Sequence, residues 1–232
     1  GIGADGLIAV EPSRGKGGTV RMRYYNADGG EAEMCGNGAR CFGNFAAALL
    51  HHDKSAPLPF ETMAGIVTAT FEKDGNVTVN LTDPHSLQLF VLNADPAVGA
   101  DVHFLNTGVP HAVAFLDKLD GLDVPRLGAY LRYHSAFSPK GTNANFARIL
   151  SPGHIAIRTY ERGVEDETLA CGTGMTASAL LHAVLTDAPS PIQVDVAGGD
   201  TLKVGFQRTG DRFTSVTLTG PADLVFTGDI EL

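Results

Sequence analysis

One motif occurs twice in this chain, and the repetition constrains the fold more than any other feature. Residues 31–38 and 167–174 both read E-x-x-x-C-G-x-G, and each copy precedes an alanine-rich apolar segment. Each copy also follows a strand-like alternation of side chains, at residues 20–25 and 155–160, and a turn that contains glycine. Both halves therefore predict the same order of strand, turn and helix.

The spacing of the repeated features indicates a duplication. Cys35 and Cys171 lie 136 positions apart, and the leucines of two L-T-x-P segments, Leu81 and Leu218, lie 137 apart. A single offset thus relates features spread across both halves, as expected for an internal repeat. We predict an α+β protein of two pseudo-symmetric lobes, each a curved and mostly antiparallel sheet wrapped around a central helix.

The repeat also sets the expected domain boundaries. Residues 1–83 are expected to form the N-terminal lobe and residues 84–220 the C-terminal lobe. Residues 221–232 are predicted to form a last strand that returns to the first lobe.

Net charge and the lack of long apolar runs make some classes of binding partner less favourable. The 232 residues carry 17 Lys and Arg against 26 Asp and Glu, a net charge of −9, which disfavours binding to nucleic acid. No apolar run approaches the ~20 residues of a membrane helix and no secretory leader is evident, so we expect no membrane partner and a cytoplasmic location. Three cysteines cannot all be paired in disulfides, and thiols are expected in a reducing compartment.

The motif has a chemistry of its own. A cysteine followed by Gly-x-Gly at a strand-to-helix junction lies where backbone N–H groups lack partners and the helix dipole favours negative charge. Such a site favours a thiolate, and the glycines let a carboxylate approach the backbone. One copy alone would fit a buried structural cysteine better.

Two copies favour a different interpretation. In pseudo-symmetric lobes the two thiols would face one cleft, which suits inversion of a carbon stereocentre by one base and one acid. A redox disulfide is the rival interpretation, although the chain has no C-x-x-C. Zinc is weaker, because Cys35 and Cys41 would point to opposite sides of a helix and no usual ligand spacing completes a set.

Several segments, in the expected order, resemble diaminopimelate epimerase, and the resemblance covers nearly the whole chain. These are Gly1 to Pro12, Asn26-Ala27-Asp28-Gly29, Met34 to Cys41, Pro110 to Val113, Thr142 to Phe146, Tyr160 to Gly163 and Ala170 to Gly174. The family interconverts LL- and meso-diaminopimelate, on the route to lysine and peptidoglycan, without pyridoxal phosphate or metal. The resemblance therefore implies a small-molecule substrate and no cofactor. It leaves the oligomeric state open, with a homodimer among the options.

The resemblance also implies roles for individual residues. Cys35 and Cys171 would be the acid/base pair. The backbone N–H groups of Gly36, Asn37, Gly172 and Thr173 would bind the reacting carboxylate. The other end of the substrate would be held by Asn26, Asn143, Glu161 and Arg162. We expect Cys41, which has no counterpart in the second copy, to be a packed helix residue.

The sequence departs from the family pattern at three places, one of which is Gly6, where some relatives carry a glutamine. The family's G-N-D-F-like segment does not precede Gly1, so the first lobe is expected to lack its front. The common G-N-P-H reads Gly108-Val109-Pro110-His111, and Asn106 is a candidate to replace the missing amide. His111 is a candidate for orienting a catalytic group, or an ordinary hydrogen-bonded histidine.

The motif C-G-x-G is shared with relatives of proline racemase, so two alternatives stay open. One is another two-thiol racemase, acting on proline or hydroxyproline. The other is a catalytically inactive ligand-binding relative.

Overall fold

The computed structural model describes residue 4 and residues 6–15, 17–26, 29–32 and 34–229. Parts of two quoted motifs, at residues 1–3, 5, 27–28 and 33, lie outside the described residues. The chain divides into two compact units: an N-terminal unit of Gly1–Asn80 and Thr219–Leu232, and a C-terminal unit of Leu81–Leu218. Within the described residues, no helix combines the length and apolarity needed to cross a membrane.

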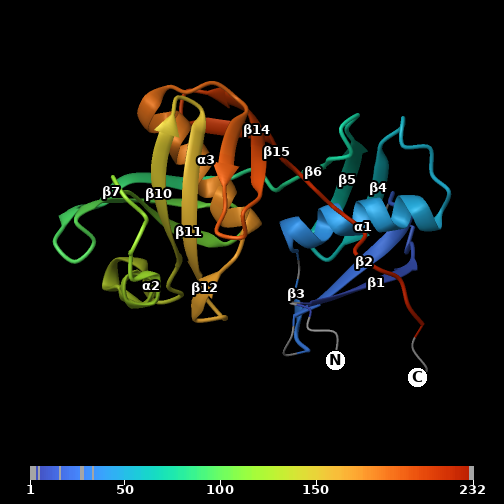
Figure 1. Ribbon diagram of the computed structural model, residues 1–232, viewed down its shortest axis with the longest axis horizontal. Helices are drawn as coiled ribbons and strands as arrows, with labels where there is room; N and C mark the ends of the chain where they lie inside the picture. The colour runs from blue at the N-terminus through green and yellow to red at the C-terminus, as the bar shows by residue number, and fades with distance from the viewer. Residues whose placement is uncertain (1–3, 5, 16, 27–28, 33, 230–232) are drawn as a thin grey trace. The chain divides into compact units, whose positions relative to one another are not determined.

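The N-terminal unit packs one helix, α1, against a sheet (Figure 1). The sheet order is β1-β2-β4-β5-β6, with the short β3 pairing with β2; β2 and β4 are parallel and the other pairs antiparallel. The elements are β1 (Gly6–Pro12), β2 (Val20–Asn26), β3 (Glu31–Ala32), α1 (Gly36–Leu49), β4 (Leu58–Thr62), β5 (Gly65–Phe71) and β6 (Val77–Asn80).

Small and aromatic residues bring α1 close to the sheet. Ala39, Phe42 and Ala46 are buried on one helical face, and the Phe42 and Phe60 rings lie 4.6 Å apart between centroids. A Cβ added at Gly43 would come within 2.6 Å of the Ala69 Cβ on β5, so glycine is required for this approach. The alanine-rich sequence after the first motif copy thus fixes the helix on its sheet.

The C-terminal unit holds the longer sheet, whose order is β15-β14-β13-β11-β10-β9-β8-β7, with β12 on β11. The pairs β9/β10 and β11/β13 are parallel, whereas β7/β8, β8/β9, β10/β11 and β13/β14 are antiparallel. The strands are β7 (His85–Asp95), β8 (Ala100–Asn106), β9 (Pro110–Phe115), β10 (Asn143–Ser151), β11 (His154–Glu161), β12 (Asp166–Thr168), β13 (Ile192–Asp195), β14 (Thr201–Thr209) and β15 (Arg212–Gly220). The helices are α2 (Val124–Tyr133), the 3₁₀ helix η1 (Ser135–Phe137) and α3 (Gly172–Thr186).

Two helices of this unit pack in different ways. Helix α3 is buried along most of its length, and Met175, Leu180 and Leu181 are fully inaccessible. Helix α2 buries one face, with Leu127 and Leu131 in a cluster that includes Phe146 on β10. An all-round apolar helix belongs inside a core, and an amphipathic one belongs on its surface.

The mixed sheets and separate helices confirm the predicted α+β class. The internal duplication and the pseudo-symmetry of the lobes stay predictions.

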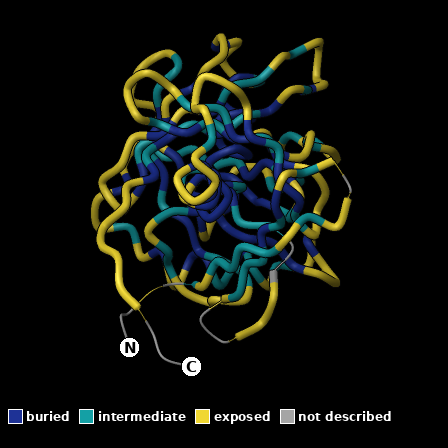
Figure 2. Tube along the Cα trace, turned by 90° about the vertical axis from the view of Figure 1, so that its right-hand side faces the viewer, coloured by how far each residue is buried: buried dark blue, intermediate teal, exposed yellow. Residues whose placement is uncertain are grey.

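The predicted last strand after Gly220 is wrong. Strand β15 ends at Gly220, and the described residues 221–229 are in no strand. Two side chains of α1 bind their backbone instead: Arg40 Nε donates to Pro221 O at 3.4 Å and Asn44 Nδ2 donates to Ala222 O at 2.7 Å. Pro221 also has no N–H to donate to a ladder. Residues 223–229 are exposed (Figure 2).

Candidate active site

Cys35 occupies the N-cap of α1. Its backbone is extended, with φ −133° and ψ 117°, and its half-buried Sγ accepts a hydrogen bond from the Gly38 N–H at 3.4 Å. A Cβ on Gly38 would meet Cys35, Ile8 and Met22 at 3.4 Å each, an ordinary contact distance. One N–H group of the first turn of α1 therefore points at the sulfur.

The polar side chains beside Cys35 are held by the helix itself. Asn37 Oδ1 accepts from Arg40 Nη1 at 2.9 Å, and this guanidinium is almost fully buried. Gly36 is buried and Asn37 is partly exposed. A buried cation thus reaches back to the first turn of the helix that Cys35 caps.

Cys171 occupies the corresponding N-cap of α3, with φ −120° and ψ 111°. It is buried, and its Sγ lies 3.5 Å from Thr173 Oγ1. Thr107, in the turn after β8, donates its hydroxyl to Thr173 O at 2.9 Å and so ties the helix start to the sheet. Gly172 is buried at the first helical position.

Three predicted substrate-binding residues of the C-terminal unit lie together. Asn143, at the start of β10, accepts the Arg162 backbone N–H on Oδ1 at 2.7 Å and donates to Pro110 O at 3.1 Å. Glu161 precedes Arg162 at the end of β11 and accepts a hydrogen bond from the Thr168 hydroxyl. The Asn143 side chain is thus partly committed to holding the turn that carries Glu161 and Arg162.

Arg162 and Asn106 line one hollow of about 420 Å³ in the C-terminal unit. Arg162 is partly exposed and donates from Nη1 to Lys140 O at 3.2 Å. Asn106 accepts the Gly108 N–H on Oδ1 at 3.0 Å, which closes the turn before β9. Val109 also lines this hollow.

His111 on β9 is fully buried. Burial, with a contribution from the charge of Arg162, lowers the pKa of this imidazole to about 3, so the ring is neutral near pH 7. Its Nδ1 lies 3.1 Å from Asn145 Nδ2, and none of the described residues provides a partner for Nε2.

Two further sequence predictions concern the N-terminal unit. Asn26 lies at the end of β2, exposed, in a turn closed by hydrogen bonds between the backbones of Asn26 and Gly30 and of Gly29 and Asn26, both 2.9 Å. The expectation that Cys41 is packed is wrong, because position 41 faces away from the buried stripe of α1 and is exposed. Partial desolvation of its thiol nevertheless raises the pKa of Cys41 above the ordinary value.

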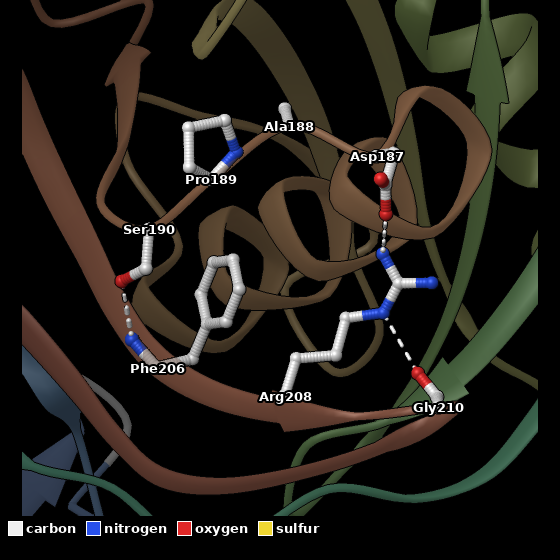
Figure 3. A pocket seen from close by; sticks show the side chains of 7 residues that line it. All are labelled: Asp187, Ala188, Pro189, Ser190, Phe206, Arg208 and Gly210. Carbon is white, nitrogen blue, oxygen red and sulfur yellow. Dashed lines mark hydrogen bonds and ion pairs between the residues drawn. The ribbon is translucent and has the colours of Figure 1, made fainter.

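A second hollow of about 440 Å³, shown in Figure 3, contains none of the predicted site residues. Its one cation, Arg208, donates to Asp187 Oδ1, Gly210 O and Ala183 O. The three acceptors belong to the same unit as Arg208, so its guanidinium is already hydrogen-bonded within the protein. Among the described residues, no three His, Cys, Asp or Glu side chains gather as a metal site.

Sequence reasoning missed Asn145, whose amide joins β9, β10 and β11. The N-x-N spacing of Asn143 and Asn145 was a usable signal, because alternate residues of a strand share a face.

Three solved structures that resemble this chain show its class of fold. A probable proline racemase from Agrobacterium radiobacter K84 matches with TM-score 0.66 and 20% identity, covering 93% of this chain and 73% of that chain. A hydroxyproline epimerase from Agrobacterium vitis gives TM-score 0.65 and 20% identity, covering 94% and 73%. A PhzF-family phenazine biosynthesis protein from Bacillus anthracis gives 0.66 and 16%, covering 95% and 82%. At these identities the likeness concerns the fold alone.

The sequence comparisons are more specific. The diaminopimelate epimerase family matches residues 1–87 and 103–225. Diaminopimelate epimerase of Chlorobaculum tepidum is 43% identical, with all of this chain and 87% of that protein covered. The same enzyme of Hydrogenobaculum sp. is 41% identical, with 98% and 80% covered. This chain belongs to the diaminopimelate epimerase family.

Proposed function

We propose that this protein is an isomerase that interconverts LL- and meso-diaminopimelate, with Cys35 and Cys171 as its acid and base. The observation that carries the chemistry is the shared position of the two thiols, each at the N-cap of a helix that begins Gly-x-Gly. Family membership supports the substrate and the place of the reaction in lysine biosynthesis.

The reaction requires a thiolate and a thiol on opposite faces of one carbon. The thiolate removes the α-proton, the thiol delivers its own proton to the other face, and the two sulfurs have then exchanged protonation states. The reverse reaction uses the same groups in opposite roles.

The negative charge of the carbanion must be delocalised, and the substrate's own α-carboxylate accepts it. The proposed donors are the N–H groups of Gly36 and Asn37 on α1 and of Gly172 and Thr173 on α3. The first N–H groups of a helix have no intrahelical acceptor, and the helix dipole favours an anion there. Such donors are fixed before the reaction and need no reorganisation as charge develops.

The far end of diaminopimelate carries a second carboxylate and ammonium. Arg162 suits the carboxylate because its planar guanidinium binds two oxygens at once, and Glu161 suits the ammonium. Asn143 and Asn26 are the proposed amide partners. The hydrogen bond from the Arg162 N–H to Asn143 supports this assignment, because it links two members of the set.

The deciding experiment is α-proton exchange in deuterated buffer with LL-diaminopimelate, lysine and proline at equal concentration. We expect exchange on diaminopimelate and very slow exchange on the other two, since a site built for buried polar groups loses about 1–3 kcal/mol for each one left unpaired. Equal exchange on proline would replace the proposal with a proline-type racemase. Binding of diaminopimelate without exchange would indicate an inactive relative.

Arg162→Lys tests the far end separately. A lysine keeps the charge but not the two-pronged contact, so kcat/KM on diaminopimelate should fall by about 10- to 100-fold. The matched control is Arg126→Lys, since Arg126 makes an exposed ion pair with Asp123 on α2. Equal activity of both variants would remove Arg162 from the site.

A further inference from the structure

Asn145 is a fully buried amide on β10 that contacts three neighbouring elements. Its Nδ2 donates to Ala112 O on β9 at 3.0 Å and lies 3.1 Å from His111 Nδ1. Its Oδ1 accepts the Thr159 hydroxyl of β11 at 3.0 Å. Both donor hydrogens and the acceptor are thus used, as a buried amide requires.

The first turn of α3 also packs against this amide. A Cβ added at Gly174 would collide with Asn145 Oδ1 and would contact the Cys171 Cβ at 3.4 Å. The first turn of α3 therefore leaves no room beside Asn145, which in turn contacts His111.

The orientation of the amide is fixed by its surroundings. The Ala112 carbonyl can only accept a hydrogen bond, so the nitrogen of the amide must face it. Reversal would set Oδ1 against that carbonyl oxygen. With the nitrogen in place, its second hydrogen is directed at His111 Nδ1, which must then accept.

This orientation decides the tautomer of His111. A neutral imidazole carries one proton, and a ring whose Nδ1 accepts must hold that proton on Nε2. Nε2 is buried and has no partner among the described residues. A buried donor without a partner is unfavourable, so this N–H points to an acceptor that arrives with the ligand or forms during the reaction.

We propose that Asn145, which packs against the first turn of α3, is a positioning residue for the epimerase reaction: it fixes His111 as the Nε2–H tautomer and so keeps one donor ready for an anionic group. This inference rests on the proposed function for its catalytic part. A neutral donor stabilises an anion without acting as a competing acid, which a two-thiol proton relay requires.

Asn145→Asp is the most informative variant because an aspartate has almost the same shape as asparagine but replaces the amide by a carboxylate. A carboxylate cannot donate to Nδ1, so it would draw the proton to Nδ1 or make the ring cationic. Thr159→Val is the matched control, since it removes the hydrogen bond at Oδ1 and leaves both Nδ2 contacts in place.

The first measurement is the nitrogen NMR spectrum of histidine-labelled protein, with His111 assigned by the signal lost in His111→Gln. We expect a bare Nδ1 and a protonated Nε2 in the wild type and in Thr159→Val, and a protonated Nδ1 in Asn145→Asp. A protonated Nδ1 in the wild type would overturn the proposal without any variant.

The second measurement is kinetic. For Asn145→Asp we expect kcat on diaminopimelate to fall by about 100-fold with a much smaller change in KM, and by far less for Thr159→Val. A switched tautomer with normal kcat would also overturn the proposal. If the wild type shows no exchange on diaminopimelate while the tautomer is as stated, the proposed function has failed and the assignment of the ring stands.

Discussion

At the scale of single residues, the three cysteines differ in their positions on the helices. Cys35 and Cys171 are N-caps, whereas Cys41 is an exposed position one and a half turns into α1. Replacing either N-cap thiol with alanine leaves no acid or base on one face of the stereocentre. Turnover should therefore fall by at least about 1,000-fold in each variant, measured by α-proton exchange.

Cys41→Ala is the control for this pair. It should keep near-normal turnover because its thiol is neither an N-cap nor part of the buried helix face. Near-normal exchange by Cys35→Ala would contradict the two-base mechanism.

His111 gives the protein an acid-sensitive stability. Its pKa is lowered from 6.5 to about 3 in the folded state, so below pH 6.5 the unfolded chain binds more protons than the folded one. Stability is then lost as the pH falls from 6.5 toward 3. From pH 7 to pH 5 this group should lower the free energy of unfolding by about 2 kcal/mol.

The measurement is urea unfolding of the wild type and His111→Gln at both pH values. Other carboxylates and histidines titrate in both proteins, so the difference between their pH dependences reports His111. Identical pH dependences would show that the buried ring is not held neutral.

Among elements, the starts of α1 and α3 differ in how tightly they pack, although both begin Cys-Gly-x-Gly. A Cβ at Gly174 would collide with Asn145, whereas one at Gly38 has ordinary contacts. Gly174→Ala should therefore lower the free energy of unfolding by about 1–3 kcal/mol and reduce turnover. Chemical denaturation and the exchange assay measure the two effects.

Gly38→Ala is the matched variant in the other helix. It should change stability by less than about 1 kcal/mol, because ordinary contacts and the higher helix propensity of alanine offset any small strain. Equal destabilisation by the two substitutions would contradict the difference in packing.

Sequence patterns predicted the elements next to the motifs. The periodic segments became α1, α3, β2 and β11, because period and capping are local properties. Helix α2 was missed, although Asp123 caps it and Pro125 stands in its first turn. The strand predicted after Gly220 failed because a strand needs a neighbouring ladder, which no local pattern reports.

The sequence names the candidate site residues but not the contacts that they make. Alternation places Asn143 and Asn145 on one face of a strand. Sequence cannot tell that Asn143 holds the Arg162 turn or that Asn145 contacts His111, because those partners come from 19 and 34 positions away along the chain. Such contacts follow from the strand order, which is a property of the whole sheet.

For the whole molecule, the decisive feature is that the N-terminal unit is built from both ends of the chain. Its helix α1 donates to the Pro221 and Ala222 carbonyls, and Thr78 on β6 hydrogen-bonds Thr219 at 2.7 Å between hydroxyls. A chain ending at Leu218 should therefore lose hydrogen-exchange protection in α1 and keep it in α3.

A chain ending at Phe226 is the control, since it retains both carbonyls and all of β15. It should protect α1 as the full chain does. Equal protection of α1 in the chain ending at Leu218 would show that the returning segment contributes nothing to the N-terminal unit.

The returning segment, residues 219–232, also determines the order in which the two units can be completed during synthesis. Residues up to Asn80 are made long before Thr219, and at about 5–20 residues per second the delay is roughly 7–28 s. The C-terminal unit is continuous in sequence, so all of it is translated before residues 219–232, which complete the N-terminal unit. The part of the protein that is made first is therefore the part that is finished last.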